Sequence, residues 1–190
     1  MTIEGLLALI SFVSLSPAQA AEAPKELKMQ IHKNEKWSGN TMKTEEFGAK
    51  FEVLKTHTLI EVAPHSEVKV QLNSEPESIE LITGMARAHV QKKLDAASNK
   101  VKFLLNAKVA TMGVRGTDFL AIATPILGES EIIVFEGNVD FTSASDGRDM
   151  KNIPAGHWGG IGGRFGAKTH ELIELPKQTL EYFNQVSSVK

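Results

Sequence analysis

After residue 50 the chain alternates apolar and polar residues with the period of two that is typical of half-buried β-strands. The alternation is clearest at three sets of positions: Thr58, Ile60 and Val62; Val68, Val70 and Leu72; Val101, Phe103 and Leu105. Turn-forming residues separate these runs, at Pro64 and over 73–78. Two further runs, 119–123 and 132–135, lack polar alternation, which indicates strands buried on both faces. This succession of short strands predicts an all-β fold, either a sandwich or a short β-solenoid.

The last part of the chain has a different pattern. Residues 159–166 are rich in glycine and indicate a hinge or loop, and Pro176 stands where a helix can begin. After it, Leu180, Phe183 and Val186 recur at threefold spacing. This spacing predicts a short amphipathic α-helix that starts directly after Pro176 and ends at about Val186. The helix either packs on its own domain or docks on a partner.

The N-terminal end carries a run of small and apolar residues over 5–15, and Ala18-Gln19-Ala20 then fits the small-x-small pattern of a signal-peptide cleavage site. The run is too short for a membrane span of about 20 residues. We therefore expect residues 1–20 to be a signal peptide that is cleaved after Ala20, and the mature protein to be periplasmic or secreted. Glu4 stands where a positive charge is usual, so a start upstream of the first residue stays open.

Composition narrows the classes of function. The 190-residue chain has a formal net charge of -2, so it has neither the basic surface of a nucleic-acid-binding protein nor a basic patch for a membrane surface. It contains no cysteine, which excludes disulfides, thiolate metal sites and cysteine catalysis. Beyond the N-terminal run, no apolar stretch is long enough to span a membrane.

Motifs for catalysis, metals and nucleotides are missing from the sequence. The six histidines are scattered, without a His-x-His or His-Glu-x-x-His pair for zinc, and no Gly-x-Ser-x-Gly element marks a nucleophile. Residues 162–169 come near a phosphate-binding loop, but Ala167 replaces the glycine that must approach the phosphate. We therefore expect no catalytic residues, no cofactor and no metal. A hydrolase is the weakest of the functions considered.

Four glycine-containing motifs follow one another in the β-rich part of the chain. They are Leu81-Ile-Thr-Gly84-Met-Ala, Val114-Arg-Gly116-Thr-Asp-Phe119, Val134-Phe-Glu-Gly137-Asn-Val139 and Ile153-Pro-Ala-Gly156-His157. In this order and at this spacing they resemble the FecR-type periplasmic domain, the family named for the iron-dicitrate transport regulator, over residues 50–162. The resemblance implies an all-β domain that is not an enzyme. It also implies that the domain binds a protein or another envelope ligand in signalling or envelope organisation.

The resemblance has consequences for how the chain is organised. The membrane-bound regulators of this family carry a sigma-factor-binding segment and a transmembrane helix before the domain, where this chain has the expected signal peptide. We therefore expect a free-standing exported member of the family. Its parts are a signal peptide (1–20), an N-terminal segment (21–49), the FecR-like domain (50–162) and a glycine-rich linker with the C-terminal helix (163–190). No residue indicates iron binding; only the family name carries a link to iron.

Three charged side chains are candidate contacts. Gly113 and Gly116 flank Arg115, so the strand can bulge and redirect that side chain, and Asp118 lies within reach of a cross-strand cation. Arg115 and Asp118 then form a recognition site, or Arg115 has a structural role, bonding to backbone carbonyls or to Asp118. Glu136, directly before a glycine, either stabilises a turn or makes a contact with a partner.

Trp158 is the fourth candidate contact. It lies in a predicted glycine-lined turn, where an exposed indole could stack on a sugar ring; the other interpretation is an anchor packed against the core. An exposed indole would suit the alternative function, a glycan- or peptidoglycan-binding β-domain. The expected function is the binding of an envelope protein partner, through a sheet face or an exposed strand edge.

Overall fold

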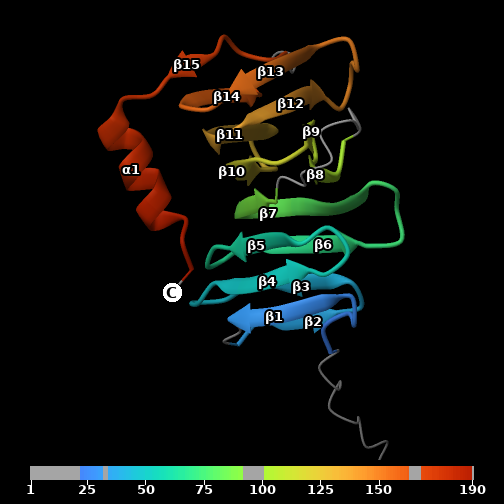
Figure 1. Cartoon of the computed structure of the whole chain (residues 1–190). Helices are drawn as coiled ribbons and strands as arrows, with labels where there is room; N and C mark the ends of the chain where they lie inside the picture. The colour runs from blue at the N-terminus through green and yellow to red at the C-terminus, as the bar shows by residue number, and fades with distance from the viewer. Residues whose placement is uncertain (1–21, 32–33, 92–100, 163–167, 190) are drawn as a thin grey trace, which may run out of the picture.

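The computed structural model describes residues 22–31, 34–91, 101–162 and 168–189, which form fifteen β-strands and one α-helix (Figure 1). The predicted all-β fold with a short C-terminal helix is confirmed. The predicted signal peptide and residues 163–166 of the glycine-rich stretch lie outside the described residues. The predicted hinge or loop is wrong over 159–161, because these residues belong to the strand β14 (His157–Ile161).

The strands form one sheet that curls on itself into two layers, and the long strand β7 (Glu77–Val90) belongs to both. Layer A contains, in order, β1 (Leu27–Ile31), β4 (Ala49–Val53), β5 (Thr58–Val62), the second half of β7, β10 (Asp118–Thr124), β11 (Glu129–Glu136), β14 (His157–Ile161) and β15 (Ile173–Glu174). Layer B contains β2 (Lys36–Ser38), β3 (Thr41–Lys43), β6 (Glu67–Gln71), the first half of β7, β8 (Phe103–Ala107), β9 (Ala110–Val114), β12 (Asn138–Ser143) and β13 (Met150–Pro154). Neighbouring strands are antiparallel except β7 and β8, which are parallel.

The hydrophobic core lies between the two layers. Alternate residues of the strands point into it, as the sequence pattern predicted; in β8, Phe103 and Leu105 are fully buried and Leu104 is half-buried. Strand β10 is buried on both faces over 118–121, which confirms that prediction. In β11 it holds only over 132–134, because Ile133 is the one outward-facing residue of the strand that is buried. Leu120 and Ile133 are each 1% exposed although they belong to positions that point away from the core.

The chain passes from one layer to the other at the glycines of the four sequence motifs. Gly84 lies within β7, Gly116 between β9 and β10, Gly137 between β11 and β12, and Gly156 between β13 and β14, with φ values of 90°, 134°, 77° and 81°. At Gly137 close packing adds to the backbone requirement, because a Cβ would lie 2.8 Å from the carbonyl oxygen of Gly116. The motifs therefore have one structural role in common: the chain passes between the two layers at each of them, by a bend within β7 at Gly84 and by turns at the other three glycines.

Several of these turns stack against one another along one narrow side of the molecule. The Val90 amide, at the end of β7, donates to the carbonyl oxygen of Thr117 at 2.8 Å. The Ala155 amide donates to the carbonyl oxygen of Gly137 at 2.9 Å. The column of turns brings together side chains from β7, β9, β11 and β12, which are far apart in the sequence.

The C-terminal helix α1 (Lys177–Val186) has the predicted bounds and lies beside layer A (Figure 1). It packs on its own domain, with Leu180 and Phe183 partly buried and Ser187 buried directly after the helix. Val186 is 47% exposed, so its predicted place in the apolar stripe is wrong. Ser187, four residues after Phe183, takes that place because an α-helix repeats every 3.6 residues. Among the described residues, no helix has the length and apolar character needed to cross a bilayer.

Candidate interaction site

The crossover between β9 and β10 separates the side chains of Arg115 and Asp118. Arg115 lies 3.8 Å from the carboxylate of Asp140 in β12, and the carboxylate of Asp118 is bonded to Arg87 in β7. The interpretation in which Arg115 pairs with Asp118 is therefore wrong. The two side chains are only three residues apart, but the turn at Gly116 lies between them and sends them to different sides.

Two shallow hollows flank this crossover. The first, of about 300 Å³, is lined by Arg115, Thr117, Asp140 and Asn152 together with Gly116 and Gly137. The second, of about 350 Å³, is lined by His89, Gln91, Thr117 and Glu136 and by the same two glycines. We call the two hollows together the crossover site. The structure thus brings the predicted candidates Arg115 and Glu136 to one place, on either side of Thr117.

The crossover site offers charge and hydrogen bonds. The side chains of Arg115 and Asp140 are 47% and 33% exposed, and Asn152 donates to Asp140 at 2.8 Å. Thr117 is 4% exposed, and its hydroxyl has no hydrogen-bond partner among the described residues. A buried hydroxyl without a partner is uncommon in folded proteins and marks a position that needs an explanation. Within the described part of the chain, no three acidic or histidine side chains are grouped so that they could hold a metal ion.

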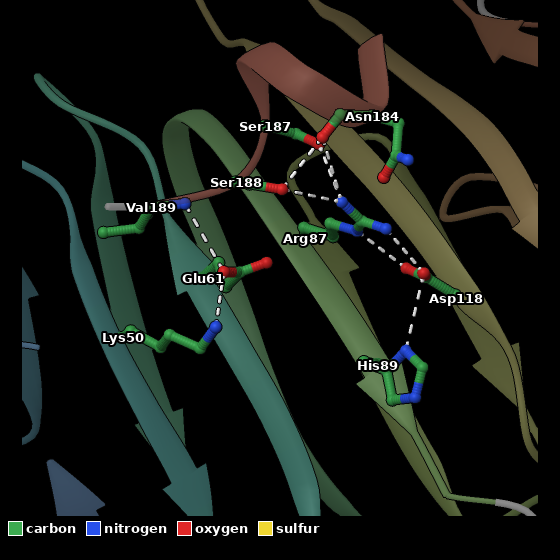
Figure 2. A network of polar contacts seen from close by, with 9 residues as sticks. All are labelled: Lys50, Glu61, Arg87, His89, Asp118, Asn184, Ser187, Ser188 and Val189. Atoms are coloured by element: carbon green, nitrogen blue, oxygen red, sulfur yellow. Dashed lines mark hydrogen bonds and ion pairs between the residues drawn. The ribbon is translucent and has the colours of Figure 1, made fainter. Parts of the chain in front are cut away.

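Behind the crossover site, Asp118 forms a buried ion pair with Arg87 (Figure 2). The guanidinium donates from Nε to one carboxylate oxygen at 2.8 Å and from Nη2 to the other at 2.6 Å. His89 Nδ1 lies 3.4 Å from the same carboxylate. The side chains of Arg87 and Asp118 are only 11% and 8% exposed. The hydrogen bonds that Arg87 donates to Asp118 raise the pKa of Arg87 above its usual range, against the opposing effect of burial, so Arg87 stays charged.

Arg87 also holds the end of the C-terminal helix (Figure 2). Its Nη1 donates to the carbonyl oxygen of Asn184 at 3.2 Å and to the hydroxyls of Ser187 and Ser188 at 3.4 and 3.2 Å. The last turn of α1 contains no basic residue, so Arg87 supplies the positive charge that stabilises a helix C-terminus. The sequence analysis did not find Arg87, because nothing in its own segment indicates a partner thirty-one residues away.

Trp158 lies apart from the crossover site. It belongs to β14, so the predicted turn is wrong at this position; the turn ends at Gly156, the last residue before the strand with a positive φ. The indole is partly buried, its nitrogen donates to Glu131 at 3.1 Å, and its ring stacks near His170 with a centroid distance of 6.1 Å. Glu131 lies on the outer side of layer A, in β11, and His170 lies in the segment next to that layer. Neither residue belongs to the column of turns.

The sequence model of one family matches residues 40–140, more than half of the chain, and its description is "FecR protein". The chain belongs to the FecR family. The matched part of this FecR chain contains the bend at Gly84 and the turns at Gly116 and Gly137. It also contains all the residues that line the two hollows of the crossover site except Asn152. Helix α1 and Trp158 lie beyond it.

Two solved structures have a similar fold. Both are crystal structures, at 2.50 and 1.65 Å, of a protein from Parabacteroides distasonis ATCC 8503 that is described as a "putative anti-sigma factor". Their TM-scores are 0.59 and 0.60, at 13% sequence identity, over 75% and 76% of this FecR chain. The chain spans 62% and 64% of the length of those proteins. None of the curated proteins matches its sequence.

Proposed function

We propose that this FecR-family protein is a non-catalytic regulator in envelope signalling, and that it binds a protein partner through the crossover site. The observation that carries the proposal is the position of Arg115, Thr117 and Glu136. They lie in the turns that the family motifs form, around two adjoining hollows, and one of them has an unpartnered hydroxyl.

The family and the solved neighbours support a regulatory role. The neighbours' description as anti-sigma factors indicates a class of proteins that acts by binding other proteins. Because the chain spans less than two thirds of their length, its partner and its place in a signalling chain are part of the proposal. We further propose that residues 1–20 are removed as a signal peptide and that the protein works in the periplasm or outside the cell. Residues 50–162 are then the binding domain, 21–49 an N-terminal segment and 163–190 the linker and helix.

The chemistry of the crossover site supports binding rather than bond making. Asp140 is held by Asn152 at 2.8 Å and lies near Arg115, so its carboxylate is not poised as a general base beside a nucleophile. Charged groups at a partly exposed rim set the specificity and the association rate of a protein complex more than they set its affinity. A partner's hydrogen-bonding group satisfies the Thr117 hydroxyl only if that side chain turns toward the hollow, because the hydroxyl oxygen itself is buried.

The experiment is photo-crosslinking in the native envelope, with a photoreactive residue at position 115 and, as the matched control, at position 148. Arg148 is also an arginine next to a carboxylate, but its side chain is 93% exposed on a turn away from the hollows. We expect one dominant protein to be captured from position 115 and not from position 148.

The variant Thr117→Val tests the same site without opening a cavity. Replacing a buried hydroxyl that has no partner by a methyl group leaves folding nearly unchanged, so loss of the captured protein reports recognition. Capture of the same protein from both positions, or of wall fragments alone, would show that the crossover site does not bind a protein partner.

A further inference from the structure

Glu77, the first residue of β7, is a charged side chain at a position that faces the core. Side chains two residues apart in a strand point to the same face, so Glu77 continues the row of Ile79 and Leu81, which are fully buried. Glu77 is itself only 4% exposed, and its Oε2 atom has no hydrogen-bond partner among the residues that the structure describes. A buried carboxylate oxygen without a partner is destabilising, because it loses its hydration and gains no bond in return. The fold alone therefore does not explain a glutamate at this position.

Glu77 lies at the edge of the core, where it lines an open hollow of about 510 Å³. The hollow lies between the turn that joins β4 to β5 in layer A and the beginnings of β7 and β8 in layer B. Lys55, Glu75 and Lys102 also line it. We call it the Glu77 hollow. It shares no lining residue with the two hollows of the crossover site, so it is a separate place on the molecule.

The Glu77 hollow combines a buried carboxylate with two lysines. Neither lysine satisfies Oε2 of Glu77, since that atom has no partner among the described residues. Lys55 bonds to Glu75 at 3.2 Å, but these two side chains are 60% and 86% exposed, so their pair is weak and Lys55 is available to another anion. A ligand that is only an anion would leave Glu77 unmatched, and the lysines would repel a ligand that is only a cation. A ligand that carries both charges matches the hollow.

We propose that the Glu77 hollow is a binding site for a small zwitterion of the kind of a free amino acid, with the ammonium group at Glu77 and the carboxylate at Lys102 and Lys55. Because Oε2 is buried, the ammonium group approaches Glu77 from the hollow. Both carboxylate oxygens share the negative charge, and rotation about the last side-chain bond exchanges them. The volume lies within the range of about 300–1,000 Å³ that is usual for small-molecule sites. The proposal does not depend on the crossover site, and it adds a small ligand to the protein partner proposed above.

The test is an NMR titration of the ¹⁵N-labelled protein with the twenty common amino acids, added one at a time. We expect at least one of them to shift the amide signals of Glu77 and Phe103, which are partners in the pairing of β7 with β8, and not that of Gly137 in the crossover site. The N-acetyl form of that amino acid lacks the ammonium group, and its amide form lacks the carboxylate. Each form should bind about ten-fold more weakly or worse, because one hydrogen bond between charged groups is lost.

The variant Glu77→Gln removes the charge and keeps the shape of the side chain. It should weaken the binding of the same amino acid about ten-fold or more. The matched control is Glu80→Gln, which changes a partly exposed glutamate of the same strand that points to the opposite face, and it should leave the affinity unchanged.

The N-acetyl and amide forms test the unchanged protein, so the result does not depend on how well Glu77→Gln folds. The proposal is overturned if no amino acid shifts the signals of residues 77 and 103, or if the N-acetyl form binds as tightly as the free amino acid. Equal affinities of Glu77→Gln and Glu80→Gln overturn it as well.

Discussion

Removal of either partner of the buried Arg87–Asp118 ion pair should destabilise the protein strongly, and removal of both should cost little more than removal of one. We consider Arg87→Met, Asp118→Ala and the double variant. In Arg87→Met the carboxylate of Asp118 stays buried without its guanidinium partner, and the remaining side chain beside it is that of His89, whose Nδ1 lies at 3.4 Å. In Asp118→Ala the guanidinium loses both of its shortest hydrogen bonds.

The magnitude follows from geometry and burial. The pair is bidentate, at 2.8 and 2.6 Å, and both side chains are about nine-tenths buried. Breaking such a pair on one side costs about 3–5 kcal/mol, mostly because an unpaired charge stays buried. The double variant leaves no unpaired charge, so the two effects should not add, and we expect a coupling energy of about 3 kcal/mol or more, close to the cost of one single variant. With a urea m-value of about 2 kcal/mol/M, each single variant should lower the unfolding midpoint by about 1.5 M or more.

The assay is equilibrium urea unfolding followed by circular dichroism, with the pair Arg115–Asp140 as the control cycle. These two side chains are 3.8 Å apart and 47% and 33% exposed, so their coupling should stay below about 0.5 kcal/mol. Additive costs for Arg87→Met and Asp118→Ala, or a coupling no larger than that of the control pair, would refute the argument that Asp118 and Arg87 act as one buried unit.

Two other changes test the turns and the attachment of the C-terminal segment. Gly137→Ala should lower the free energy of unfolding, measured in urea, by about 1–3 kcal/mol, because φ at Gly137 is 77° and the new Cβ meets the carbonyl of Gly116. The control Gly147→Ala, whose new Cβ meets nothing within 4 Å, should leave the free energy of unfolding nearly unchanged. Equal effects of the two substitutions would contradict this prediction. Thr169 donates to Asp149 through its hydroxyl and its amide, and these bonds lower the pKa of that carboxyl. This contribution is fully present above the ordinary aspartate pKa of about 3.9 and is lost as pH falls through the lower folded-state pKa. The protection of the residue 169 amide, which is its exchange rate compared with the intrinsic rate at the same pH, should therefore fall only in that acid range, and this acid-dependent step should disappear in Asp149→Asn.

Local patterns in the sequence were enough for several strands and for α1, but not for β14, where the sequence predicted a turn. Alternation at Val68 and Val70 predicts a strand because successive side chains of a strand point to opposite faces. The threefold spacing after Pro176 predicts α1 with its observed bounds. Gly116 and Gly137 mark turns because only glycine adopts a positive φ easily, and that requirement is local to the residue.

Only the tertiary structure decided which distant side chains meet. Arg87 and Asp118 are thirty-one residues apart, and their pairing depends on the register between β7 and β10. A shift of that register by one residue would move every side chain of the strand to the other face. For the same reason the sequence alone offered Asp118 as one possible partner of Arg115, and it did not anticipate that Arg87 would hold the end of a helix a hundred residues further along the chain. Periodicity determines which face a residue occupies within its own element, whereas the partners on that face depend on how separate elements pack.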